Sequence, residues 1–407
     1  MLSSALRTLK LMCLLALPFA LPAIAQETAS STPDATAATA TTVSQFVFVP
    51  MGDNTSFGST DRRMSEYRIN PTTGALTVVN KALKAQNLAT FSFRDPKHRF
   101  LYIVGSVPGS GFSFNDIAEY RVNSSTGAIT ALPGSPFGAN TQQELAFGVI
   151  RPDLKFAYIL DFRSVNILHI IAMNPTTGAM VKEVGTFNIP GSGDFLFDLR
   201  FDPTGRFLYI AEGESNAIDA FFSDPTAGGL SQINGSPFVP RGSSPQTCSP
   251  RLNFCGGAVA ITGNNHLYYV SMLFDGVAEF AINPTTGALS ELPGSPALNP
   301  AHEGLGVRVA PNGKHLYVNA PVQFGQSTVV AYTINTTTGK LTKVTGSPFK
   351  VPGTDNFMDI DETGHFLYTA NGSTVSGFHI NSTTGVLTRV PGSPYSVPGN
   401  TGLTIVH

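Results

Sequence analysis

The chain has 407 residues, of which 42% are apolar and 13% are charged, and it contains 40 glycines, 29 prolines and no tryptophan. A formal charge of −2 gives no basic surface for a polyanion, so a nucleic-acid partner is not expected. Glycine and proline at this frequency, without a collagen-like period, indicate many turns between short strands and favour one large all-β domain.

Residues 1–25 have the pattern of a secretory signal peptide. Arg7 and Lys10 precede an apolar run over 11–24, and residues 23–25 (Ala-Ile-Ala) match a small-x-small cleavage site. The apolar run is short and interrupted by proline, which disfavours a membrane anchor. The sequence therefore predicts an exported protein, secreted or periplasmic, with no membrane span after cleavage.

The segment 26–44 is rich in alanine, threonine and serine, and it is expected to be a flexible linker because it cannot bury enough apolar surface to fold. Two cysteines remain after the signal peptide, Cys248 and Cys255. In an oxidising compartment such a pair predicts a disulfide, with two free thiols as the alternative. A zinc site is less favoured, because no histidine lies nearby at ligand spacing.

One phrase, close to Asn-Pro-Thr-Thr-Gly-Ala-Leu, recurs seven times in the rest of the chain. The copies lie at 69–76, 122–129, 173–180, 223–230, 282–289, 334–341 and 380–387. Its Asn or Asp, its proline and its glycine suit successive positions of a hairpin turn, and the flanking residues alternate as in half-buried strands. The copies follow one another at about 50 residues, a period typical of propellers and solenoids.

A second phrase, of the type Asp-Pro-Thr-Gly-Arg-Phe-Leu-Tyr-Ile, lies between these turns and reads as strand, tight turn, strand. Clear copies occur at 93–103, 201–210, 309–318 and 360–369, and weaker ones at 150–159 and 261–270. The two phrases together give four antiparallel strands per repeat, which is a propeller blade. Proline and β-branched residues throughout each repeat exclude an α-solenoid.

The two ends of the repeat region predict how the ring closes. Residues 46–50 match the second strand of a blade, whereas residues 402–407 match a first strand with nothing after it. Three strands, six complete blades and one strand make seven blades, and the last strand then completes blade 1 and leaves no long free edge. We therefore expect residues 45–407 to form an all-β, seven-bladed propeller closed by the C-terminal strand.

These phrases, together with the Leu-Pro-Gly-Ser-Pro-Phe segment that follows several of them, resemble the seven-bladed lactonase propellers. That family includes 6-phosphogluconolactonases of the propeller type and a fungal muconate cycloisomerase, and surface proteins with YVTN-type repeats are close to it. The resemblance covers residues 45–407. It implies a lactone hydrolase, a carboxylic-ester hydrolase by class, and no cofactor motif appears in the chain, so none is expected.

The positions at which the family carries its typical catalytic groups are mostly different here. The family's histidines align with Glu144 and Ala146, and its Arg-His pair aligns with Phe197 and Asp198. Its Asn-Glu pair aligns with Glu212 and Gly213, and a later arginine aligns with Pro321. A slip of one residue brings Glu212 or Glu214 into the glutamate column. Glu144 and Glu212 are accordingly candidate ligand-binding residues rather than inherited catalytic ones.

Four charged residues share one side of the inner strands by period-two alternation, while apolar residues occupy the other side. They are Asp198, Arg200, Arg308 and Asp359. Charges in such a position are costly unless they are paired or hydrated. Two interpretations remain open: structural Arg–Asp pairs in a hydrated channel, or a site in which the arginines bind an acidic or hydroxyl-rich ligand.

His302 and Glu303 begin the loop that enters the sixth inner strand, and an imidazole beside a carboxylate is a candidate general base. With Arg308 they form the candidate catalytic set, although decoration of an exposed loop is the alternative. Four other histidines lie at the short turns before the Leu-Tyr strands: His98, His266, His315 and His365. That placement is structural, so no metal site is expected from them.

The leading hypothesis is an exported lactone hydrolase, and an unphosphorylated sugar lactone suits an extracytoplasmic site better than a phosphorylated one. The alternative is a non-catalytic propeller whose variable loops bind a glycan, a cell-wall component or a protein. A quinoprotein oxidoreductase is disfavoured, because the chain has no tryptophan docking motif and no haem motif. We expect a monomer.

Overall fold

The structure is a computed structural model that describes residues 43–50, 63–86, 88–106, 116–138, 145–161, 166–190, 196–213, 215–243, 257–271, 274–298, 304–322, 326–352, 357–371, 373–397 and 402–407. Outside these residues lie the signal peptide 1–25, nearly all of the linker 26–44, the cysteine pair Cys248 and Cys255, and the candidates Glu144, His302 and Glu303. The predictions for them stay predictions.

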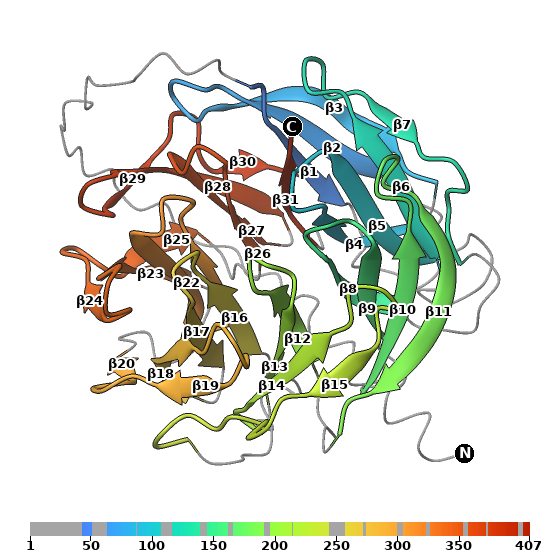
Figure 1. Ribbon diagram of the computed structural model, residues 1–407. Coiled ribbons are helices and arrows are strands. Elements are labelled where there is room, and N and C mark those ends of the chain that lie inside the picture. The colour runs from blue at the N-terminus through green and yellow to red at the C-terminus, as the bar shows by residue number, and fades with distance from the viewer. Residues whose placement is uncertain are drawn as a thin grey trace, which may run out of the picture.

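The described strands form seven antiparallel sheets around a central axis, and each sheet has four main strands (Figure 1). The first strands of neighbouring sheets contact one another, so they form the inner ring. From the axis outward, the first three blades are β31 (Thr404–Val406), β1 (Phe46–Pro50), β2 (Arg63–Ile69) and β3 (Leu76–Lys84); β4 (Leu88–Arg94), β5 (Phe100–Ser106), β6 (Asp116–Val122) and β7 (Ile129–Ala131); and β8 (Leu145–Ile150), β9 (Phe156–Asp161), β10 (Ile167–Met173) and β11 (Met180–Asn188).

The remaining four blades follow the same order. They are β12 (Leu196–Phe201), β13 (Phe207–Glu212), β14 (Ile218–Ser223) and β15 (Leu230–Gln232); β16 (Gly257–Ile261), β17 (His266–Ser271), β18 (Phe274–Ile282) and β19 (Leu289–Glu291); β21 (Gly306–Val309), β22 (His315–Val322), β23 (Gln326–Ile334) and β24 (Leu341–Lys343); and β26 (Phe357–Ile360), β27 (Phe366–Asn371), β28 (Thr374–Ile380) and β29 (Leu387–Arg389). Three short strands, β20 (Ala297–Leu298), β25 (Phe349–Pro352) and β30 (Tyr395–Ser396), pair with the third strands of blades 5, 6 and 7.

The ring closes as the chain ends predict. Strand β31 pairs antiparallel with β1, with Phe46 opposite Val406 and Val47 opposite Ile405. Figure 1 shows the C-terminal strand beside the first strand, so the two ends of the propeller share one sheet. The predicted count of seven blades with four antiparallel strands each is therefore confirmed.

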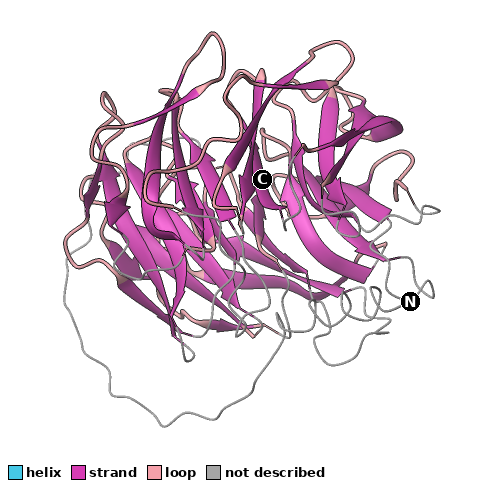
Figure 2. Cartoon of the chain, turned by 90° about the horizontal axis from the view of Figure 1, so that it is seen from below, coloured by secondary structure: helices cyan, strands magenta, loops and turns pink. Residues whose placement is uncertain are grey.

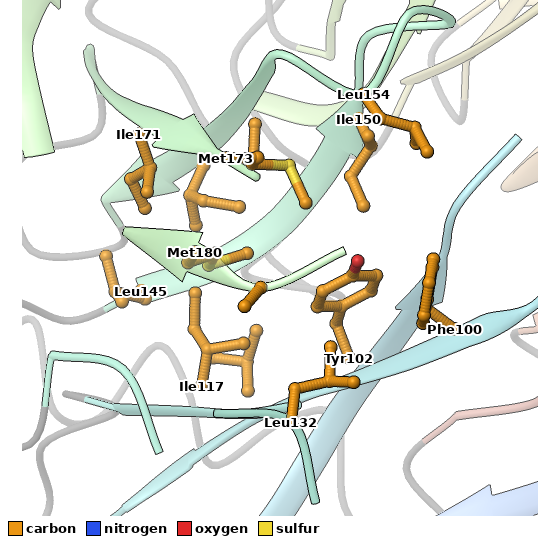
Figure 3. Packing of buried hydrophobic residues seen from close by; sticks show 14 residues of the cluster. Phe100, Tyr102, Ile117, Leu132, Leu145, Ile150, Leu154, Ile171, Met173 and Met180 are labelled. Atoms are coloured by element: carbon orange, nitrogen blue, oxygen red, sulfur yellow. The ribbon is translucent and has the colours of Figure 1, made fainter. Parts of the chain in front are cut away.

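The core lies between neighbouring blades. The second strands are covered on both faces, so in β13, for example, all six residues are buried. Figure 3 shows the apolar cluster between blades 2 and 3, in which Phe100 and Tyr102 of β5 pack near Ile150, Met173 and Met180. Each face of a sheet contacts a different neighbouring blade. Successive side chains of a strand therefore pack alternately against the preceding and the following blade, rather than against a core and solvent.

The seven recurring turns are built by local hydrogen bonds. In the first copy the Oδ1 atom of Asn70 accepts hydrogen bonds from the backbone amides of Thr72 and Thr73, and Gly74 has a φ of +70°. Asparagine or aspartate is favoured at the first position because its side chain caps the turn. Glycine is favoured at the later position because it tolerates positive φ.

A tyrosine in the second strand of six blades binds the turn of the next blade. Its hydroxyl donates to the turn glycine's carbonyl at 2.7–3.1 Å in the pairs Tyr102–Gly178, Tyr158–Gly228, Tyr209–Gly287, Tyr268–Gly339, Tyr317–Gly385 and Tyr368–Gly74. In blade 1 the register places Phe48 at this position, which has no hydroxyl to donate. The repeated tyrosine thus fixes each blade against its neighbour.

The strands run between two faces of the molecule, seen edge-on in Figure 2. We call the end with the turns that join strands one to two and three to four the turn face, and the opposite end the loop face. Among the described residues, no helix is long and apolar enough to cross a membrane.

Candidate functional site

Charged side chains gather on the inner strands that surround the axis. They are Arg94 on β4, Asp198 and Arg200 on β12, Arg308 on β21, and Asp359 on β26. Four of them, all except Arg94, are the charged residues that the alternation predicted on one side of the inner strands. The structure brings the five together as two ion-paired groups around the central axis, and we call the region that the inner strands surround the channel.

The first group has the carboxylate of Asp198 between two guanidinium groups. Its Oδ1 lies 3.0 Å from Nη2 of Arg200, and its Oδ2 lies 3.7 Å from Nη1 of Arg308. The same Oδ2 accepts a hydrogen bond of 3.3 Å from the backbone amide of Val259. Asp198 therefore joins blades 4, 5 and 6 at the channel.

The second group joins blade 7 to blade 2 across the closing strand. Nη1 of Arg94 pairs with Oδ2 of Asp359 and also donates to the carbonyl of Ile405 at 2.9 Å. The amide of Ile405 donates to Oδ2 of Asp359 at 3.1 Å. Strand β31 is therefore bound on its channel side by an Arg–Asp pair that belongs to its two neighbouring blades.

Among the described residues of the inner strands, three guanidinium groups accompany two carboxylates, which leaves one positive charge in excess. Burial and the nearby Arg200 lower the pKa of Arg308 to about 10, against the opposing effect of Asp198 and Asp359. Burial by itself raises the pKa of Asp359, but Arg94 and Arg308 outweigh it and hold that pKa below its usual value. At neutral pH Arg308 and Asp359 therefore both stay ionised.

Arg308, like Arg94 and Arg200, has donor atoms that are not used within the described residues. Its Nη1 donates to the carbonyl of Val307 at 2.9 Å, and 31% of its side-chain surface is exposed. Within the described part of the chain, its Nε and Nη2 atoms make no hydrogen bond. Such a partly exposed guanidinium, held in place at one nitrogen, is suited to donate to a carboxylate, a phosphate or a carbonyl oxygen.

Arg94 was missed by the sequence analysis because it lies on the other parity. The register aligns Phe93 with Arg200, Arg308 and Asp359, each of them opposite a tyrosine of the second strand, so Arg94 corresponds to an apolar residue elsewhere. Its side chain reaches Asp359 of blade 7 across the closing strand. In the other strands the charged residue precedes the apolar one, whereas in Phe93-Arg94 it follows, and this inverted order was the signal in the sequence.

Glu212, predicted to bind ligand, is not part of the charged channel wall. It ends β13 and is 3% exposed, and its carboxylate is hydrogen-bonded to Asp219 and to the hydroxyl of Ser215. Burial and the adjacent Glu212 raise the pKa of Asp219 to about 9, so this pair holds a proton at neutral pH. Asp219 could not be identified from the sequence, because it meets Glu212 only across the strand pair.

Blade 3 has a related buried group at the corresponding positions. His169 is 4% exposed and lies between Asp161, 3.4 Å from Nε2, and Glu183, 3.1 Å from Nδ1. Burial lowers the pKa of His169, but the two carboxylates outweigh it and raise the pKa above its usual value. This group was not predicted either, because its three members lie on three different strands.

The turn histidines have different environments. His266 and His315 are buried under the turn glycines Gly339 and Gly385, in the position that Phe207 occupies under Gly287. They are therefore structural, as their place in the sequence indicates. His365 is exposed, whereas His98 meets two partners that the sequence did not connect with it.

Comparison with known proteins agrees with this architecture. The model of the family described as lactonase, 7-bladed beta-propeller, matches residues 258–403. A predicted 6-phosphogluconolactonase of Bacteroides fragilis is 18% identical over 91% of this chain and all of its own, with a TM-score of 0.68. The periplasmic gluconolactonase of Pseudomonas aeruginosa is 14% identical over 89% of this chain and 99% of its own, with a TM-score of 0.67.

No curated protein matches the sequence of this chain. At identities this low the solved structures establish the fold alone, and the family match covers the C-terminal part of the ring. The chain is therefore a seven-bladed β-propeller, and its C-terminal part is similar to the lactonase family.

Proposed function

We propose that this protein is an extracytoplasmic lactone hydrolase that binds a sugar lactone in the central channel, with Arg308 as the residue that contacts the reacting carbonyl. The observation that carries the proposal is the arrangement of Arg200, Asp198 and Arg308, in which one carboxylate holds two guanidinium groups and Arg308 keeps donors in reserve. The two structural neighbours described above support the choice of a gluconolactone-type substrate.

The chemistry requires only a water molecule. Water adds to the lactone carbonyl carbon, the ring C–O bond breaks, and the ring oxygen takes a proton to give the open hydroxy acid. Negative charge develops on the carbonyl oxygen in the tetrahedral intermediate, and a fixed guanidinium donor stabilises it there. The carboxylate product is also an anion, so the excess positive charge of the channel wall favours both species. The proposed base that activates water is His302 or Glu303, which precede β21 and Arg308 in the chain.

The test offers the protein a panel of unphosphorylated and phosphorylated aldonolactones. Hydrolysis is measured as the rate of acid release above the rate in buffer. We expect Arg308→Ala to lower kcat by about 100-fold, which is typical for loss of one oxyanion donor, and Arg308→Lys to recover part of it. Arg206→Ala is the matched control, because Arg206 binds carbonyls of the adjacent blade on the turn face. No turnover by the wild-type protein across the panel would falsify the hydrolase.

A second candidate is binding without catalysis. It is favoured because both carboxylates of the channel, Asp198 and Asp359, are in ion pairs. The described residues of the inner strands therefore offer hydrogen-bond donors but no unpaired carboxylate that could act as a base. Calorimetry with aldonates and a glycan array separates the two candidates. Binding that depends on Arg308, with no hydrolysis of the corresponding lactone, supports the binding protein.

Export is part of the proposal, since the pattern of residues 1–25 and the periplasmic location of the Pseudomonas aeruginosa neighbour both support it. The mature protein should begin at Gln26, which N-terminal sequencing of extracytoplasmic material determines. A full-length protein in the cytoplasmic fraction would contradict this part of the proposal.

A further inference from the structure

Three side chains with metal-binding chemistry meet on the turn face where the ring closes. His98 lies in the turn after β4 of blade 2, Glu362 in the turn after β26 of blade 7, and His407 directly after β31 of blade 1. They come from three consecutive blades. The ends of the chain meet at the same place, because β31 completes blade 1.

The geometry of the group is compact. Nδ1 of His98 is 2.6 Å from Oε1 of Glu362, and Nδ1 of His407 is 2.8 Å from Oε2 of the same carboxylate. One ligand atom from each residue lies within 4.8 Å of the other two. Both Nδ1 atoms are buried, and neither makes a hydrogen bond of suitable angle. Neighbouring ligands on one metal ion are about 2.8–3.4 Å apart for bonds of 2.0–2.1 Å, so only a small adjustment is needed.

The backbone holds the three residues in place. The amide of His407 donates to the carbonyl of His98 at 2.9 Å, and the amide of His98 donates to the carbonyl of Asp95 at 2.9 Å. The amide of Glu362 donates to Oε1 of Gln45 at 2.9 Å. His98 has a φ of +55° at a turn position where Gly205, in blade 4, is the ordinary solution. Leu154 in blade 3 and Asn265 in blade 5 have φ of +61° and +58° at the same position, so the positive φ belongs to the turn and fixes the direction in which the His98 side chain leaves the backbone.

The nearest described guanidinium would not prevent a cation from binding. Arg94 lies close enough to His98 to repel a cation there, but Arg94 is itself paired with Asp359, which reduces this repulsion.

We propose that His98, Glu362 and His407 bind one divalent transition-metal ion of the zinc class, which fastens the closing strand to the blades on either side of it. Two imidazoles and a carboxylate are a common protein donor set for zinc, and water completes the coordination. The side chains are 19%, 30% and 22% exposed, so an ion can reach them from solvent. The role is structural and lies on the face opposite the variable loops, so it is independent of the proposed hydrolase.

The test is calorimetric titration of the chelator-treated protein, purified without a polyhistidine tag, with zinc chloride. We expect one zinc ion per chain and a rise in Tm with zinc, because an ion that binds only the folded state stabilises it. His98→Asn, His407→Gln and Glu362→Gln should each weaken binding at least about tenfold and reduce the rise in Tm. Asparagine suits the conformation at position 98, since Asn265 has a φ of +58° in the corresponding turn of blade 5.

His365→Ala is the matched control, because His365 is an exposed histidine of the same turn as Glu362 and lies outside the group. A Cys248→Ser, Cys255→Ser double variant removes the thiols as an alternative site. Circular dichroism and Tm without zinc show whether each variant is folded. The proposal is overturned if no zinc binds, if His98→Asn and His407→Gln bind it like the wild type, or if either control variant loses it.

Discussion

At the scale of the residue, this fold is marked by buried carboxyl groups that bind the backbone of the next blade. Oε1 of Glu119 accepts a hydrogen bond of 2.7 Å from the amide of Met180, and Glu279 makes the corresponding contact with the amide of Leu341 at 2.5 Å. Burial raises the pKa of Glu119 to about 8, against the effect of the Met180 amide. A carboxyl with a raised pKa makes stability depend on pH.

The sign follows from the protons bound in each state. Between the unfolded pKa of about 4.5 and the folded pKa of about 8, the folded state binds more protons, so stability falls as pH rises through this window. Glu119→Gln cannot ionise, so its stability relative to the wild type should increase from pH 5 to pH 9, by about 4 kcal/mol. Urea denaturation at pH 5, 7 and 9 measures the difference. Asp153→Asn, an exposed carboxyl change, is the control, and a pH-independent difference for Glu119→Gln contradicts the assignment.

The same scale shows why the candidate site was only partly predictable. Asp198, Arg200, Arg308 and Asp359 follow from alternation, because the parity of a strand is a local property. Arg94 and the pair of Glu212 with Asp219 do not follow, since each depends on which blade a side chain meets. The group of His98, Glu362 and His407 is likewise invisible in the sequence, because ring closure alone makes these residues neighbours.

At the scale of the element, the repeated hairpins act as joints between blades. The tyrosine hydroxyl of one blade and the turn glycine of the next form six of the seven junctions, and the junction from blade 1 to blade 2 has Phe48 instead. The sequence predicted that the turn motif forms a hairpin. It did not predict that the glycine carbonyl of the turn accepts a hydrogen bond from the tyrosine hydroxyl of the neighbouring blade.

Removal of one such hydroxyl should weaken the ring without loss of packing. Tyr209 donates to Gly287 at 2.8 Å and is fully buried, so Tyr209→Phe leaves a buried carbonyl with one partner fewer. We expect a loss of about 1–2 kcal/mol in the free energy of unfolding, measured by urea denaturation at pH 7. Phe222→Leu, at a ring that is 37% exposed, serves as control and should change stability much less. A Tyr209→Phe variant as stable as the wild type would show that the joint contributes nothing.

At the scale of the whole molecule, stability depends on the closure of the circle. Strand β31 has three residues, yet it fills the inner position of blade 1 and receives the Arg94–Asp359 pair on its backbone. Without it, β1 would present a free inner edge and the two neighbouring blades would lose their contacts with it.

A change at the centre of this strand tests the role of closure. Ile405 is fully buried between blades 7 and 1, and Ile405→Ala should lower the free energy of unfolding by about 2–5 kcal/mol through lost contact and the cavity left behind. Val181→Ala, at a side chain that is 60% exposed on the outer strand β11, is the control. Thermal denaturation followed by circular dichroism gives the comparison. Equal Tm values for the two variants would mean that the closing strand is dispensable.

The sequence by itself determined the repeat, the four strands of each blade, the number of blades and the strand that closes them. These depend on turn chemistry and on side-chain alternation, both of which act over a few residues and recur seven times. Only the tertiary structure decided which charges meet in the channel, which carboxyl groups are buried against a neighbour, and that His98, Glu362 and His407 converge. Those arrangements require blades distant in the chain to be placed around one axis, and no local pattern records that placement.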